Sequence, residues 1–291
     1  MNIGIDPKVD FAFKKLLGSR EHPEITLHFL NSVLAGDPVI ESVEILNPFN
    51  EKDFDDDKLS ILDVKATDDR GRLLDIEMQT SLPGELANRL IYYAASQYVG
   101  QLREGDRYGS LMPSLGISVL NGVLFPQVPE FCLDFRMRCQ NPELTLSDAL
   151  QVHLLELPKY TPPSDNTVID DPREQWAYFF RRAATLEREE LISRLAAPIF
   201  TEATRVLEMI SKTPEDREIY ESRLKLQRDE QSRLEAAEAR GEARGEARGR
   251  VRMLEGLLGL DTPANFDSLT LEELASREQS LQRQLRERGI G

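Results

Sequence analysis

The chain has 291 residues, 40% of them hydrophobic, which suffices for one large domain with appendages or for two modest ones. Its formal net charge of -15 opposes nucleic-acid binding, because affinity for a duplex comes mostly from Lys and Arg on phosphates. A local basic cleft is nevertheless compatible with a negative net charge, and the acids are unevenly spread, with five of them in residues 51–57.

Targeting signals and thiol chemistry are not indicated. The chain has no run of about 18 uncharged apolar residues, and its first 15 residues carry acids where a secretory signal has its apolar stretch. The two cysteines form no CxxC pair, which disfavours a disulfide framework and thiolate zinc sites. We therefore expect a cytoplasmic protein without a membrane partner.

The N-terminal part of the sequence changes from helical to strand periodicity. Apolar residues recur at helical spacing over residues 10–19 and 24–34. The period then becomes two, which predicts strands over residues 39–46, 59–67 and 72–80. The last two strands flank the sequence DDRG, whose Asp and Gly are typical of a hairpin turn.

The middle of the chain continues the alternation of helix and strand. Residues 85–103 form an amphipathic pattern that predicts a helix. Apolar runs over residues 111–122, 130–139 and 152–157 predict three further strands. This order of elements predicts an α/β domain with a mixed sheet.

Four parts are expected along the chain. The Pro- and Asp-rich segment that follows Leu157 marks a boundary or a long functional loop. We expect an α/β domain over 1–160, a helical extension over 161–235, a repeat helix or linker over 236–252, and a small helical hairpin over 253–291.

The repeat consists of three tandem copies of EARG between residues 238 and 249. On a helix, four residues at about 100° each make one full turn plus roughly 40°. Equivalent residues of successive copies therefore lie almost above one another, and each residue type forms a stripe along the helix. Each Gly costs a lone helix about 1 kcal/mol relative to Ala. The repeat is either a solvated linker helix expanded by repeat slippage or a face where small residues admit a partner helix.

Polar residues interrupt the two strands of the expected hairpin. Glu77 and Gln79 are two apart and therefore face the same side of a strand, while Asp63 lies in the neighbouring strand. Two carboxylates brought together in a partly buried place are costly, and a divalent cation resolves that cost. Mg²⁺ prefers hard oxygen ligands of this kind. The alternative is a solvent-exposed sheet face on which polar residues merely alternate outward.

An ordered set of motifs carries a family resemblance. DPKVDFAFKKLLG, ILDVKATDDRG, DIEMQ, RLIYYAASQYV, LELPKY and the EARG tail together resemble the recombination-promoting nuclease and putative transposase family of bacteria, in the PD-(D/E)XK nuclease superfamily. The resemblance spans about residues 1–180 and again the repeat tail. It implies a restriction-endonuclease-like α/β core, with a mixed central sheet flanked by helices, followed by a helical C-terminal region.

The function that the resemblance implies is metal-dependent cleavage of DNA phosphodiester bonds by an endonuclease linked to recombination or mobile elements. The alternative is a catalytically weak nuclease fold that acts as a DNA-binding or self-assembly module. The partners implied are DNA and, through the helical C-terminal region, further copies of the chain.

The site implied by the resemblance centres on the DIEMQ motif. Asp63 and Glu77 would bind the metal, and the backbone carbonyl of Met78 would complete the ligand set. Gln79 stands where the superfamily has lysine, and glutamine can orient a water but carries no charge. The implied cofactor is Mg²⁺, with Mn²⁺ or Ca²⁺ as alternatives.

Further residues have both a functional and a structural interpretation. Lys65 shares a strand face with Asp63 and either supplies the missing cation or simply faces solvent. Asp10 is either a further acid beside the metal or a helix cap. Candidates for phosphate contact, each also readable as a surface or packing residue, are Lys14, Lys15, Arg89 and Tyr92.

Overall fold

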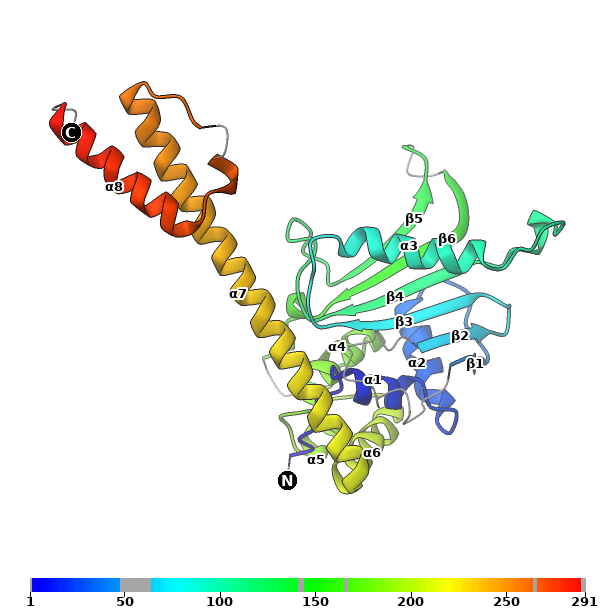
Figure 1. Ribbon diagram of the computed structural model, residues 1–291. Helices are drawn as coiled ribbons and strands as arrows, with labels where there is room; N and C mark the ends of the chain where they lie inside the picture. Colours follow the sequence, from blue (N-terminus) through cyan, green and yellow to red (C-terminus); the bar gives the residue numbers. More distant parts are fainter. Residues whose placement is uncertain (1, 48–63, 141–143, 165–166, 264–265, 289–291) are drawn as a thin grey trace. The chain divides into compact units, whose positions relative to one another are not determined.

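The computed structural model describes residues 2–47, 64–140, 144–164, 167–263 and 266–288 (Figure 1). The chain divides into two compact units, residues 1–227 and residues 228–291. Each unit has its own hydrophobic core. The division falls within the long helix α7 (Pro214–Leu258).

The first unit is built on a mixed sheet of six strands in the order β1-β2-β3-β4-β6-β5. β3 lies in the interior of the sheet, antiparallel to β2 and parallel to β4, while β6 pairs parallel with β4 and antiparallel with β5. The strands are β1 (Val43–Ile45), β2 (Val64–Asp68), β3 (Leu73–Gln79), β4 (Ser114–Leu120), β5 (Cys132–Arg138) and β6 (Thr145–Glu156).

The predicted DDRG turn joins β2 to β3. Gly71 has a φ of 75°, a left-handed conformation that glycine adopts without steric cost. The buried Asp68 carboxylate accepts hydrogen bonds from the backbone N–H groups of Arg70 and Arg72, and from Nε of Arg72 at 2.6 Å. The turn therefore fixes the register of the hairpin, in which Val64 is opposite Ile76.

Helices cover both faces of the sheet (Figure 1). α3 (Leu86–Val99) covers one face, where Leu86 and Leu90 pack with Leu120 and Leu154. The larger core lies on the other face. The helices that contribute to this core are α1 (Asp10–Leu17), α2 (Pro23–Val33), α4 (Pro172–Arg182), α5 (Arg188–Ser193) and α6 (Ile199–Lys212). This is the mixed sheet flanked by helices that the sequence predicts.

The first strand is shorter than the sequence predicts. A strand was expected over 39–46, whereas β1 begins at Val43. The Asn31 side chain of α2 accepts a hydrogen bond from the backbone N–H of Ile40 at 2.8 Å and donates one to its carbonyl at 3.0 Å. The backbone groups of Ile40 are therefore used by α2 and do not join a strand ladder.

Trp176 lies at the centre of the larger core, fully buried, with its ring against those of Phe29 and Phe200. Its Nε1 donates a hydrogen bond to Nδ1 of His28 at 3.0 Å. This bond requires a lone pair on Nδ1, and burial lowers the pKa of His28. His28 is therefore neutral in the folded protein at neutral pH.

The stability of the first unit is expected to fall as the pH drops below about 6.5, the ordinary pKa of histidine, because the unfolded chain then binds a proton that folded His28 excludes. The loss is at most about 1.4 kcal/mol per pH unit. Thermal melts at pH 7.5 and 5.5 measure it. In His28→Asn the side-chain oxygen can accept the Trp176 bond without titrating, so its melting temperature should fall less. Equal falls in both proteins would assign the effect to other groups.

The second unit is a helical hairpin formed by residues 228–258 of α7 and by α8 (Leu271–Glu287). Its core contains Val251 and Leu254 of α7 and Leu274 and Leu281 of α8. α8 begins with a capping box, in which Thr270 and Glu273 satisfy each other's backbone N–H groups. A small hairpin was predicted over residues 253–291, whereas the core of this unit also includes Ala247 and Val251.

The arginines of the EARG repeat make contacts within the second unit. Arg244 donates to the carbonyl oxygen of Leu269 at 2.7 Å, and Arg248 donates to that of Asp267. Arg252, four residues further on, lies over the Phe266 ring with its guanidinium carbon 4.9 Å from the centroid. The arginine stripe therefore holds the segment that precedes α8.

Candidate active site

Glu77 is a buried acid on the α3 side of the central strand β3. Its side chain is on the opposite face from Leu74 and Ile76, which belong to the larger core, because successive side chains of a strand alternate. Glu77 is 6% exposed. Ser118 Oγ of β4 donates to Glu77 Oε1 at 2.9 Å, and Gln79 Nε2 donates to Oε2 at 2.6 Å.

These two hydrogen bonds determine what Glu77 can do. Each carboxylate oxygen has a donor, so the side chain is held in one orientation. An ionised carboxylate has about four acceptor positions, so an oxygen that accepts a hydrogen bond can also bind a cation. The arrangement is a rigid, negatively charged oxygen pair, which is the donor type that Mg²⁺ and Mn²⁺ prefer.

Gln79 lies where the superfamily lysine is expected, and it is itself 6% exposed. Its amide donates to Glu77, so its described contact orients the acid. The sequence analysis expected Glu77 and Gln79 on one face, and the structure has them there. Met78 lies between them, with its side chain packed against the larger core on the other face.

Asp63, the second predicted metal ligand, lies outside the described residues. It directly precedes Val64, the first residue of β2, whose Cα partner is Ile76. Ile76 is in turn the neighbour of Glu77. The pair Val64–Ile76 therefore consists of the residue that follows Asp63 and the residue that precedes Glu77.

Lys65 lies on the same face of the sheet as Glu77. It alternates with the buried Val64 and Ala66, and it is exposed. Its Cα partner is Asp75, so Glu77 is its diagonal cross-strand neighbour. Diagonal neighbours lie about 7–8 Å apart, within reach of a long side chain.

Asp10 lies on the other side of the sheet. It begins α1, which packs in the larger core, and it is paired with Arg223 of α7. Arg223 Nε donates to Asp10 Oδ2 at 2.9 Å, and the Arg223 side chain is only 1% exposed. Among the contacts of Asp10 within the described chain, none is with Glu77.

The two α1 lysines proposed for phosphate contact are in packed positions. Lys14 is buried, with 4% of its surface exposed. Lys15 forms an ion pair with the buried Asp216 of α7 and lies over the Phe11 ring, 5.6 Å from the centroid. Both lysines therefore take part in the packing of α1.

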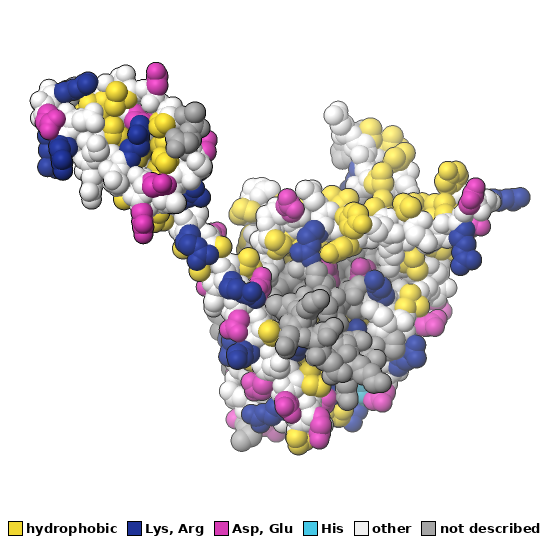
Figure 2. All heavy atoms as spheres, in the orientation of Figure 1, with side chains coloured by type: hydrophobic (Ala, Val, Ile, Leu, Met, Phe, Trp, Pro, Cys, Tyr) yellow, Lys and Arg dark blue, Asp and Glu magenta, His cyan; other side chains and the backbone are white. Residues whose placement is uncertain are grey.

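The two α3 candidates for phosphate contact lie on the Glu77 side of the sheet. Tyr92 is 67% exposed, and its ring meets that of Tyr93 edge to face. The Arg89 guanidinium lies over the Tyr93 ring, 5.8 Å from the centroid. Figure 2 shows Lys and Arg scattered among Asp and Glu on the visible face, rather than gathered in one basic stripe among the described residues.

The contact of Ser118 with Glu77 was not predicted from the sequence. Ser118 is 1% exposed and reaches Glu77 from the neighbouring strand. The signal was present in SLGISVL, where Ser114, Gly116 and Ser118 alternate with apolar residues. A buried strand with small and polar residues on one face indicates a polar site or a close approach on that face.

A family model described as PD-(D/E)XK nuclease family transposase matches residues 7–237. No curated protein and no solved structure matches the chain. Among the described helices, none combines the length and the apolar character needed to cross a membrane.

Proposed function

Because the chain belongs to the PD-(D/E)XK nuclease family transposases, we propose that it is a metal-dependent DNA endonuclease whose cation is held by Asp63 and Glu77. The family membership confirms the resemblance carried by the motifs and supports a nuclease-like or transposase-like function. The observation that carries the proposal is Glu77, a buried carboxylate oriented by Ser118 and Gln79.

The residues of the site fit a divalent cation. Glu77 offers carboxylate oxygens in a fixed orientation, and the carbonyl of Met78 is a further hard oxygen ligand in the proposal. Mg²⁺ is the proposed ion, with Mn²⁺ or Ca²⁺ as alternatives. When bound, such an ion lowers the pKa of water and stabilises charge that develops on a phosphate.

The remaining roles belong to side chains of the β2–β3 hairpin. Gln79 keeps the Glu77 carboxylate in position through its amide, and it cannot supply the positive charge of the usual lysine. Lys65 is exposed on the same face and supplies that charge in the proposal. Arg89 and Tyr92 are proposed to contact the DNA backbone from α3.

Metal removal is the direct test of this function. We expect the protein to nick supercoiled plasmid in the presence of Mg²⁺ and to stop when EDTA is added, because water activation requires the cation. The Asp63→Ala protein, prepared identically, should be inactive. Nicking that persists in EDTA, or equally in Asp63→Ala, would contradict the proposal and favour a binding or assembly module.

Self-association through the second unit is also proposed. A Cβ added at Gly241, Gly245 or Gly249 would meet nothing within 4 Å, so the glycine stripe has open space beside it in the single chain. Glycine is unfavourable in a helix by about 1 kcal/mol relative to Ala. Three exposed glycines at one spacing are therefore explained by a second copy that approaches the helix closely.

The triple substitution of these glycines by Ala is expected to stabilise the helix of the single chain by about 2–3 kcal/mol, from roughly 1 kcal/mol per site. It should also weaken self-association, because the added methyl groups separate the two helices. Circular dichroism and sedimentation velocity measure the two effects. Gly256→Ala is the matched control, since it also has open space but lies outside the repeat. If the triple variant associates like the parent, the three glycines are not part of the interface between copies.

A further inference from the structure

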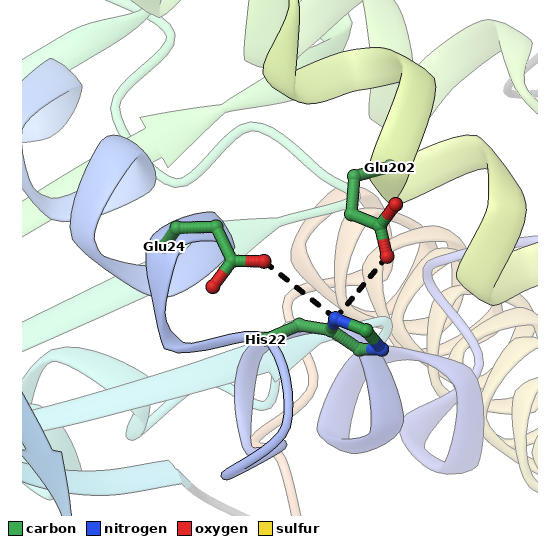
Figure 3. A group of neighbouring side chains, drawn as sticks. All are labelled: His22, Glu24 and Glu202. Atoms are coloured by element: carbon green, nitrogen blue, oxygen red, sulfur yellow. Dashed lines mark ion pairs between the residues drawn. The ribbon is translucent and has the colours of Figure 1, made fainter.

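A group of metal-ligating side chains lies away from Glu77, where α2 meets α6 (Figure 3). His22 immediately precedes α2, Glu24 is in the first turn of α2, and Glu202 is in the first turn of α6. We propose that these three residues form a second divalent metal site, which takes a transition metal of the Zn²⁺ type and ties α2 to α6.

The distances in the group suit direct coordination. His22 Nδ1 lies 3.1 Å from Glu202 Oε1 and 3.5 Å from Glu24 Oε1, and Figure 3 shows the ring nitrogen turned toward both acids. With metal–ligand distances of about 2.0–2.2 Å, neighbouring ligands lie about 2.8–3.1 Å apart in an octahedral site and about 3.3–3.6 Å apart in a tetrahedral one. The ligand atoms of all three side chains lie within 4.8 Å of one another, so one metal ion can reach them once the two carboxylates close around it.

The ligand types favour a transition metal. An imidazole nitrogen facing two carboxylates carries at most one proton, which points at one acceptor at a time. A metal on the nitrogen lone pair serves both carboxylates simultaneously. Imidazole suits Zn²⁺, Cu²⁺ and Ni²⁺, whereas Mg²⁺ and Ca²⁺ prefer sites made of oxygen alone. With three protein ligands, the site retains a position for water.

The Glu202 carboxylate is already engaged by an arginine, part of which must yield to a metal. Arg205 Nε donates to Oε1 at 3.1 Å and to Oε2 at 3.0 Å, and Arg205 Nη2 donates to Oε1 at 2.5 Å. The Arg205 side chain is 51% exposed, so it can withdraw from Oε1 while it still holds Oε2. Arg188, which is also nearby, is paired with Glu208 at 3.3 Å.

The site is separate from the proposed active centre. α2 and α6 pack on each other and on α1 in the larger core, on the other side of the sheet from Glu77. A metal there joins two helices that are far apart in sequence. Its expected effect is therefore on the stability of the first unit, and it does not depend on nuclease activity.

Zinc binding at pH 7.5 tests the proposal. The parent for the test is the Cys139→Ser protein, because Cys139 is exposed and thiols bind zinc. Competition with a chromophoric chelator should find one Zn²⁺ per chain at this site, and Zn²⁺ should raise the melting temperature. His22→Asn and Glu24→Gln should each lower the affinity for this Zn²⁺ ion by about 100-fold or more. Loss of a residue that only hydrogen-bonds to a metal ligand already costs about 10–100-fold in affinity.

Matched controls separate this site from others. Glu189→Gln changes an exposed acid in the first turn of α5 and should bind like the parent. Glu77→Gln should still bind this Zn²⁺ ion, so the result does not depend on the nuclease proposal. Glu24 is half exposed, so Glu24→Gln should fold even if His22→Asn does not. Zinc bound equally well by Glu24→Gln, or lost in Glu77→Gln, would overturn the proposal.

Discussion

Glu77→Gln is expected to reduce Mg²⁺-dependent plasmid cleavage by roughly 1000-fold. The substitution keeps the size of the side chain and replaces a charged oxygen with an amide, so the proposed cation would lose one of its two proposed acids. A bound metal supplies several kcal/mol of charge stabilisation, and about 4 kcal/mol corresponds to a factor of roughly 1000 in rate. Nicking rates at saturating Mg²⁺ measure the loss.

Two companion variants identify the cause of that loss. Glu44→Gln alters an exposed acid of the edge strand β1 in the same sheet and should cleave like the parent. Gln79→Ala removes the donor to Oε2 and leaves the charge of Glu77, so its rate should lie between those of Glu77→Gln and the parent. Full activity in Glu77→Gln, with Glu44→Gln unchanged, would exclude Glu77 as a metal ligand in catalysis.

Arg223→Met is expected to destabilise the first unit by about 3 kcal/mol, because removing one member of a buried ion pair leaves the other charge without its partner. The value is at the lower end of the usual range, since Asp10 retains 21% of its side-chain exposure. The melting temperature should fall by roughly 6–12 °C for a unit of this size. Lys225→Met, two residues along α7, is the control.

A double-mutant cycle with Asp10→Asn decides what Asp10 does. If Asp10 acts through Arg223, the double variant should be more stable than the two single losses predict, and Asp10→Asn should still cleave DNA below its melting temperature. If Asp10 is a further acid beside the metal, Asp10→Asn should lose cleavage while Arg223→Met retains it. The measurements are thermal melts and plasmid nicking on the same preparations.

The position of Glu77 and Gln79 on one face of β3 could be predicted from sequence, because the alternation of side chains along a strand is local. In a strand, two residues separated by one position share a face whatever surrounds the strand, and the apolar Ile76 indicates which face is the core. The hairpin turn was predictable for the same reason, since Asp68 and Gly71 satisfy its geometry within a few residues. The family motifs likewise depended on residue order alone.

Contacts between distant segments were not predictable in this way. Asp10 was read as either an acid beside the metal or a helix cap, and its partner Arg223 is 213 residues away. For Lys15 the sequence allowed either a phosphate contact or a surface or packing role, and its partner Asp216 is 201 residues away. A surface helix and a packed helix can have similar charge patterns, because the partner element decides which lysines are exposed.

Residue order and spacing therefore sufficed to predict the α/β class, the hairpin with its acid and amide on one face, and the family. The folded structure was needed to find the contacts of Ser118 with Glu77, of Asp10 and Lys15 with α7, and of His22 with Glu202. Backbone periodicity and turn chemistry act over a few residues, which is why they can be read along the chain. Side-chain hydrogen bonds and ion pairs instead depend on which elements pack together, and burial of apolar surface across the whole chain determines that packing.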